Sequence, residues 1–112
     1  MKEEELDVAV KKESDIPVIE VKGRIVDIDA KLVQHKIDQV YKKKLPRIVI
    51  DLSGASFLDS HGLGTIVYYH TLMQKEGRQL LILNTNTDRN SYINQLFELT
   101  NLDKVLNIVR QL

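Results

Sequence analysis

The sequence contains no cysteine, and this absence excludes several kinds of chemistry. Disulfide bonds, thiol catalysis and thiolate metal sites all require a residue that the chain lacks. Long apolar runs are missing too: no stretch reaches the roughly 18 apolar residues of a membrane-spanning helix. The charged start Met1-Lys2-Glu3-Glu4-Glu5 also lacks the apolar core of a signal peptide. We therefore expect a cytoplasmic protein that does not act in a membrane.

The chain carries no net charge, because 16 basic residues balance 16 acidic ones. A nucleic-acid-binding surface needs an excess of Lys and Arg that displaces counterions from phosphates. A helix that lies on a membrane surface typically needs a basic face. The balance therefore argues against a nucleic-acid partner and, more weakly, against a membrane surface.

The composition is that of an ordinary globular domain, with 43% hydrophobic and 29% charged residues among 112. This length favours one domain with its own core. Residues 1–5 are charged, and we predict a disordered N-terminal tail there. Residues 6–112 are predicted to form the domain, since no repeat, low-complexity tract or linker divides them.

Hydrophobic periodicity predicts strands that alternate with helices. Two strands form a hairpin that turns at Glu13-Ser14-Asp15, and a loop follows from Gly23 to Asp29. Asp29 is expected to cap a first helix, which Pro46 ends. The apolar run Arg47-Ile48-Val49-Ile50-Asp51-Leu52 is typical of a buried strand, and a loop is expected after it.

The second half of the chain continues this alternation. A helix that begins at Asp59 or Ser60 is expected to end at Gly77. Residues 80–83 then predict another buried strand, and residues 93–100 a third helix. Residues 105–109 fit either a short strand or a helix. The order predicts an α/β domain with a mixed four- or five-stranded sheet and helices packed mainly on one face.

The segment after the first buried apolar run leads to the main functional hypothesis. Phe57 and Leu58 can return the chain to the core before a helix begins at Asp59-Ser60. The Ser60 hydroxyl is then expected at a helix N-terminus and at the carboxyl edge of the sheet, where partners and ligands commonly bind. A helix N-terminus has unpaired N–H groups and partial positive charge, so it can hold a phosphate.

The same residues have a simpler interpretation. Ser or Asp before a helix is most often only its N-cap. Gly62 and Gly64 each cost about 1 kcal/mol relative to alanine inside a helix. Their benefit is close approach, either by a packed neighbouring strand or by a partner. On the residues alone, both interpretations of Ser60 stay open.

These motifs resemble those of a known family. Two segments, Ile48-Val49-Ile50-Asp51-Leu52-Ser53 and Phe57-Leu58-Asp59-Ser60-His61-Gly62-Leu63-Gly64, are similar to the STAS domain of anti-sigma factor antagonists. In that family a hydrophobic strand, Asp-Leu-Ser and an aromatic residue precede Asp-Ser-x-Gly-Leu-Gly. The similarity continues at Gly23 and at Leu96-Phe97-Glu98-Leu99-Thr100-Asn101-Leu102.

The resemblance implies a binding module that is not an enzyme. In its unphosphorylated form such a protein binds a kinase-type anti-sigma factor and so releases a sigma factor for transcription. The kinase switches the module off by phosphorylating the serine that follows Asp, and a serine phosphatase reverses the switch. The implied phosphorylation site is Ser60. The implied partner-binding residues are Asp59, Ser60, His61, Gly62, Leu63, Gly64 and Asp27.

Several positions depart from the family pattern. His61 takes a position that usually holds Ser, Thr or Ala, which changes the surroundings of the phosphorylation site. Arg24 and Val26 replace the usual Glu and Asp after Gly23, and Asn101 replaces a common Gly. Because the sequence stops at Leu112, we expect the family's last helix to be short or absent.

Nucleophilic catalysis has little support in the sequence. Adjacent residues at a helix start diverge by about 100°, so His61 is badly placed to activate Ser60. The Gly-x-Ser-x-Gly elbow and a Gly-rich nucleotide loop are also missing. We therefore expect no enzymatic activity.

Metal and cofactor sites have little support either. His35, His61 and His70 lack a metal-ligand spacing. Four carboxylates could meet at one sheet edge as a magnesium site, but such residues are more often caps and loop charges; they are Asp27, Asp29, Asp51 and Asp59. We expect no metal and no cofactor. Two alternative functions remain: a non-switching scaffold or accessory subunit in which Ser60 is only a cap, and a sensor of a nucleotide or anion at the same helix start.

Overall fold

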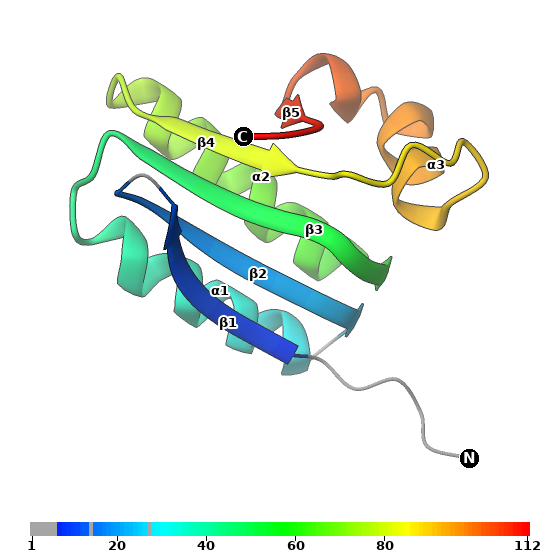
Figure 1. The fold of residues 1–112 in the computed structure, drawn as a ribbon, viewed down its shortest axis with the longest axis horizontal. Coiled ribbons are helices and arrows are strands. Elements are labelled where there is room, and N and C mark those ends of the chain that lie inside the picture. The colour runs from blue at the N-terminus through cyan, green and yellow to red at the C-terminus, as the bar shows by residue number, and fades with distance from the viewer. Residues whose placement is uncertain (1–6, 14, 27) are drawn as a thin grey trace.

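A computed structural model describes residues 7–13, 15–26 and 28–112. Within these residues the chain forms a five-stranded sheet and three α-helices (Figure 1). The elements in chain order are β1 (Asp7–Glu13), β2 (Ile16–Ile25), α1 (Ile28–Tyr41), β3 (Arg47–Leu58), α2 (Ser60–Lys75), β4 (Gln79–Leu83), α3 (Tyr92–Leu99), the 3-10 helix η1 (Leu102–Lys104) and β5 (Asn107–Val109). The predicted tail, residues 1–5, lies outside the described residues.

The sheet is mixed, as predicted. Its strand order is β1-β2-β3-β4-β5, with β1 antiparallel to β2 and all other neighbours parallel. The parallel part follows from the crossovers through α1, α2 and α3, each of which returns the chain to the same end of the sheet. Residues 105–109, for which periodicity left two possibilities, contain the short edge strand β5.

The core lies between the sheet and one layer of helices. α1 and α2 cover the same face of the sheet, and α3 lies near the carboxyl end of β3 (Figure 1). Strand alternation separates neighbouring side chains: Ile19 joins the large core under the helices, whereas Val18 joins a small cluster on the other face. The prediction of helices mainly on one face is therefore confirmed.

β3 is longer than its apolar run predicts. The expected loop after Leu52 is wrong, because β3 continues to Leu58. This extension pairs with the end of β2, with Gly54 opposite Lys22 and Leu58 opposite Ile25. The extension contains small and polar residues, so it lacks the apolar pattern that predicts a strand. It is held in the sheet by backbone hydrogen bonds, which do not depend on the side chains. The extension carries the chain directly to the start of α2.

Gly23 lies inside β2 and does not open a loop. Its φ is 94°, and the pairing of β2 with β3 shifts register between Gly23 and Arg24. A bulge with positive φ favours glycine, and this explains the glycine at position 23. The loop expected from Gly23 onwards is therefore wrong, because β2 continues to Ile25. Asp29 is also not the N-cap of α1, because the helix begins at Ile28 and Asp29 lies in its first turn. Asp27, an expected partner contact, lies outside the described residues.

Candidate functional site

The helix α2 begins at the point where β3 leaves the sheet. The Asp59 N–H donates to the Ile25 carbonyl at 3.0 Å, which ties the connection to the end of β2. The Asp59 carboxylate accepts the Gly62 N–H at 2.9 Å and so forms the N-cap of α2. The sequence left Asp59 and Ser60 as alternative caps, and the structure assigns the cap to Asp59. Ser60 is therefore the first helical residue, and it is exposed.

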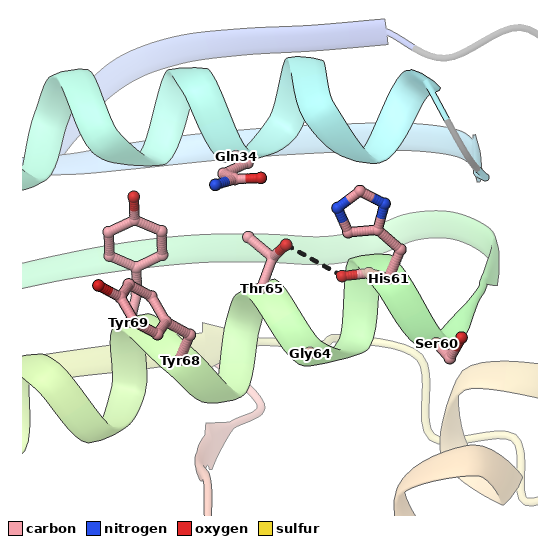
Figure 2. Close-up of a pocket in the computed structure, with 7 residues that line it drawn as sticks. All are labelled: Gln34, Ser60, His61, Gly64, Thr65, Tyr68 and Tyr69. Carbon is pink, nitrogen blue, oxygen red and sulfur yellow. Dashed lines mark hydrogen bonds between the residues drawn. The ribbon is translucent and has the colours of Figure 1, made fainter.

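Ser60 and His61 diverge at this helix start. The His61 ring extends towards α1, whereas Ser60 lies in the first turn of α2, farther from α1, where it lines the rim of the space between the two helices (Figure 2). The two side chains point in different directions, as expected of adjacent residues at a helix start. Both side chains are exposed, so both can be reached by another protein.

The two glycines near the start of α2 have different surroundings. Gly62 is buried, and a Cβ there would lie 2.5 Å from Leu58 Cδ1 and 3.0 Å from Ile25 Cγ2. Gly62 therefore allows α2 to pack closely on β2 and β3. A Cβ on Gly64 would meet nothing within 4 Å. The sequence left two explanations open for these glycines, close packing against a strand or close approach by a partner. Packing explains Gly62 and does not explain Gly64. Leu63, between them, is half-buried against the core.

A groove of about 410 Å³ lies between α1 and α2 and reaches Ser60. Figure 2 shows its lining residues, which are Gln34, Ser60, His61, Gly64, Thr65, Tyr68 and Tyr69. Thr65 donates a hydrogen bond to the His61 carbonyl at 3.0 Å. The groove could not be predicted from the sequence, because no motif brings α1 next to the expected site. Tyr69 is buried and Tyr68 is 59% exposed.

The other end of the helix pair is closed by polar contacts. The Tyr69 hydroxyl donates to Asp38 at 2.9 Å, and the Tyr41 hydroxyl donates to Glu76. Arg78 donates to the carbonyls of Leu45 at 2.7 Å and Tyr41 at 3.1 Å. We call these contacts, made by Tyr41, Glu76, Arg78, Asp38 and Tyr69, the polar network.

The polar network shifts the titration of its members. Hydrogen bonds from Tyr41 and Arg78 hold the pKa of Glu76 below its usual value. Hydrogen bonds from Lys42 and Tyr69 lower the pKa of Asp38 in the same way. Burial and the hydrogen bond to Asp38 raise the pKa of the Tyr69 hydroxyl. At neutral pH these groups therefore keep the charge states that the contacts require.

A stack of planar groups supports the end of β3 just before Asp59. The Arg24 guanidinium lies 4.5 Å from the centre of the Phe57 ring, which stacks on Tyr92 of α3 at 4.7 Å. The Tyr92 hydroxyl donates to the Leu58 carbonyl at 3.0 Å. Arg24, a departure from the family pattern, thus has a packing role on Phe57. Asn101, another departure, has a φ of 59°, which asparagine tolerates well.

Two of the acidic residues considered for a metal site, Asp51 and Asp59, make separate local hydrogen bonds. Asp51 accepts the Ser53 N–H at 2.9 Å, and Asp59 caps α2. In the part of the chain that the structure describes, no three or more His, Asp or Glu side chains are grouped so as to hold a metal. Among the same residues, no helix has the length and apolar character needed to cross a membrane.

Known proteins share this sequence pattern and this fold. The family model of the STAS domain matches residues 7–112. An anti-sigma F factor antagonist of Paenibacillus polymyxa is 22% identical over 92 residues, which are 81% of this chain and 75% of that protein. The crystal structure of an anti-sigma factor antagonist from Mycobacterium paratuberculosis has a TM-score of 0.78 at 22% identity, covering 96% of this chain and 88% of that one. The anti-sigma factor antagonist SpoIIAA in its unphosphorylated form has a TM-score of 0.72 at 15% identity, covering 92% and 88%.

Proposed function

The chain belongs to the STAS domain family, and from this we propose that it is an anti-sigma factor antagonist. In its unphosphorylated form it binds a kinase-type anti-sigma factor in the cytoplasm and frees a sigma factor for transcription. It is a binding module without catalytic activity of its own. The anti-sigma factor kinase phosphorylates Ser60 and so ends the interaction, and a serine phosphatase restores it.

The position of Ser60 is the observation that carries this proposal. Ser60 is exposed at the start of α2, and the cap is made by Asp59. The Ser60 hydroxyl is therefore not needed to start the helix. This arrangement weakens the alternative of a scaffold in which Ser60 is only a cap.

A phosphate on Ser60 affects the fold and the interface differently. At a helix N-terminus it meets the positive end of the helix dipole, so the fold tolerates it. In the interface it adds about −1.5 to −2 charges beside Asp59. Like charges placed against each other across an interface can cost several kcal/mol, which is enough to release a partner.

Phosphorylation and binding are tested with a purified kinase-type anti-sigma factor from the same organism. After incubation with the kinase and ATP, intact mass and peptide mapping should place one phosphate on Ser60 and none on the Ser60→Ala variant. In calorimetric titrations without ATP hydrolysis, wild type and Ser60→Ala should bind alike, and Ser60→Asp about tenfold or more weakly. Wild-type affinity of Ser60→Asp would refute the charge mechanism, and a phosphate at another residue would refute Ser60 as the acceptor.

A sensor of a nucleotide or anion at the same helix start is the other function to test. A ligand that binds only the folded protein raises its apparent stability. A thermal-shift screen with nucleotides and inorganic phosphate therefore separates this function from the proposed one. A specific increase in Tm that Ser60→Asp abolishes would favour the sensor.

A further inference from the structure

Gly64 lowers the stability of α2, and neither packing nor backbone conformation requires a glycine there. Glycine in a helix interior is less favourable than alanine. Elsewhere in the chain glycine has a local task, as for Gly62, where a side chain would collide with Leu58. Gly64 has neither a positive φ nor a neighbour within 4 Å of an added Cβ. Local rules that are broken without compensation mark positions that serve a function.

Tyr68 gives this exposed point a large rigid surface. It lies one helical turn after Gly64 and is 59% exposed. Its ring meets that of Tyr69 edge to face at 5.0 Å, and Tyr69 is held by its hydrogen bond to Asp38. An exposed tyrosine on a fixed base is typical of the residues that dominate protein–protein binding energy. Beside it, Gly64 leaves open space where a side chain would otherwise stand.

The charges around the groove point to one kind of partner. The groove continues into a second hollow along α1, lined by Lys31, Gln34, His35, Asp38 and Tyr69. Among the described residues that line the two hollows, Asp38 is the only carboxylate, and it accepts from Tyr69 and pairs with Lys42 at 2.9 Å. The other polar side chains include the cation of Lys31 and the N–H groups of Gln34 and His61, which suit carboxylates.

We propose that the α1–α2 groove receives an acidic segment of the anti-sigma factor. The segment lays its backbone and small side chains on Gly64 and Tyr68, and directs carboxylates to Lys31 and His61. This inference rests on the proposed function. It also explains how the switch acts on binding, because Ser60 lines the same groove. A phosphate on Ser60 repels the carboxylates that the groove otherwise attracts.

Gly64 provides a test in which stability and affinity move in opposite directions. Gly64→Ala should raise the Tm by about 3 °C, since alanine is the better helix former. It should also weaken binding to the anti-sigma factor several-fold, and Gly64→Leu should weaken it by about tenfold or more. Gln74→Leu is the matched control, because it adds an exposed leucine to α2 outside the groove. Its affinity should stay that of wild type.

Lys31 provides the test of charge. Lys31→Glu should weaken binding about tenfold and make the affinity less sensitive to salt, because an attractive pair becomes repulsive. Lys43→Glu makes the same change at an exposed residue that lines neither hollow, and it should bind like wild type. If wild type binds while Gly64→Leu and Lys31→Glu bind equally well, the groove is not the docking site and the proposed function stands. If wild type itself does not bind, both proposals fail.

Discussion

At one end of the α1–α2 pair the side chains are tied to each other, whereas at the other end they line an open groove. The tied end holds the contacts of Tyr41, Glu76 and Arg78, in which Arg78 donates to two carbonyls near the end of α1. The Tyr69–Asp38 bond of the polar network lies at the border between this end and the groove. The open end holds Gly64 and Tyr68, whose exposed surfaces contribute little to the fold. The helices thus have their spacing set at one end, and a groove of defined width results at the other.

The polar contacts between the two helices lie at the end of the helix pair that is farther from Ser60. Side-chain hydrogen bonds between α1 and the end of α2 lie away from Ser60, so a charge added at Ser60 leaves them intact. The proposed switch can therefore change binding without unfolding the protein. Variants that break the tied end should lower stability, and variants at the open end should mainly change affinity.

Arg78→Ala should have the largest effect on stability. The side chain is 10% exposed, donates to two carbonyls and lies 4.8 Å from the centre of the Tyr41 ring. Removing it leaves these acceptors poorly satisfied, which we expect to cost about 2–4 kcal/mol of unfolding free energy. Urea denaturation measures this loss. Lys44→Ala, which removes a cation exposed over the same ring, is the control and should cost less than about 0.5 kcal/mol. Equal losses for the two variants would show that the tied end is not fixed by Arg78.

Gly62→Ala should have the next largest effect. Its Cβ would lie 2.5 Å from Leu58 Cδ1, so α2 would have to move from the sheet. Overpacking of this kind typically costs about 1–3 kcal/mol. Gly64→Ala, two residues away in the same helix, should instead gain about 0.5–1 kcal/mol. Thermal and urea unfolding of both variants measure this contrast, and a loss of stability in Gly64→Ala would show that its surroundings are not open.

Elements with a clear hydrophobic period could be predicted from the sequence. The apolar runs that end at Leu52 and Leu83 correctly indicated buried strands, and Gly77 correctly indicated the end of α2. Its φ of 72° is the conformation that glycine favours at a helix C-terminus. These signals are local, since each depends on residues within one or two turns of each other.

The rest depended on contacts between distant parts of the chain. The extension of β3 is held by backbone pairing with β2, and the pattern of side chains in the sequence does not indicate this pairing. The cap of α2 could be placed at Asp59 or Ser60, but choosing between them needed the side-chain geometry. The groove and the polar network join residues such as Asp38 and Tyr69, which are 31 positions apart. Family resemblance pointed to Ser60, and the α1 side of the groove had no signal in the motif.

Tyr69→Phe should have a smaller effect than the glycine substitution. The variant removes one hydrogen bond to Asp38 and keeps the buried ring. Because Asp38 still pairs with Lys42, no carboxylate is left without a partner, and the expected loss is about 1 kcal/mol. Tyr68→Phe should leave stability unchanged, since the Tyr68 ring is largely exposed. Urea denaturation measures the unfolding free energy of both variants. Equal stabilities of Tyr69→Phe and Tyr68→Phe would show that the bond from Tyr69 to Asp38 does not stabilise the fold.

The smallest effect concerns pH. The pKa of Glu76 is lowered in the folded protein, chiefly by the hydrogen bond from Tyr41 and then by that from Arg78. The folded state therefore binds this proton less readily than the unfolded chain does. The resulting stabilisation is fully present above the unfolded value of 4.5 and is lost as the pH falls through the lower folded pKa.

Glu76→Gln should remove this part of the pH dependence. Its unfolding free energy should change less than that of wild type between about pH 5 and pH 3, since the variant has no proton to gain at this position. Because Asp38 keeps its own lowered pKa, some acid dependence should remain. Urea denaturation at several pH values measures the difference in slope. Identical slopes for wild type and Glu76→Gln would mean that this carboxylate does not link α1 to α2 in solution, and the tied end would then depend on Arg78 and the Tyr69–Asp38 bond alone.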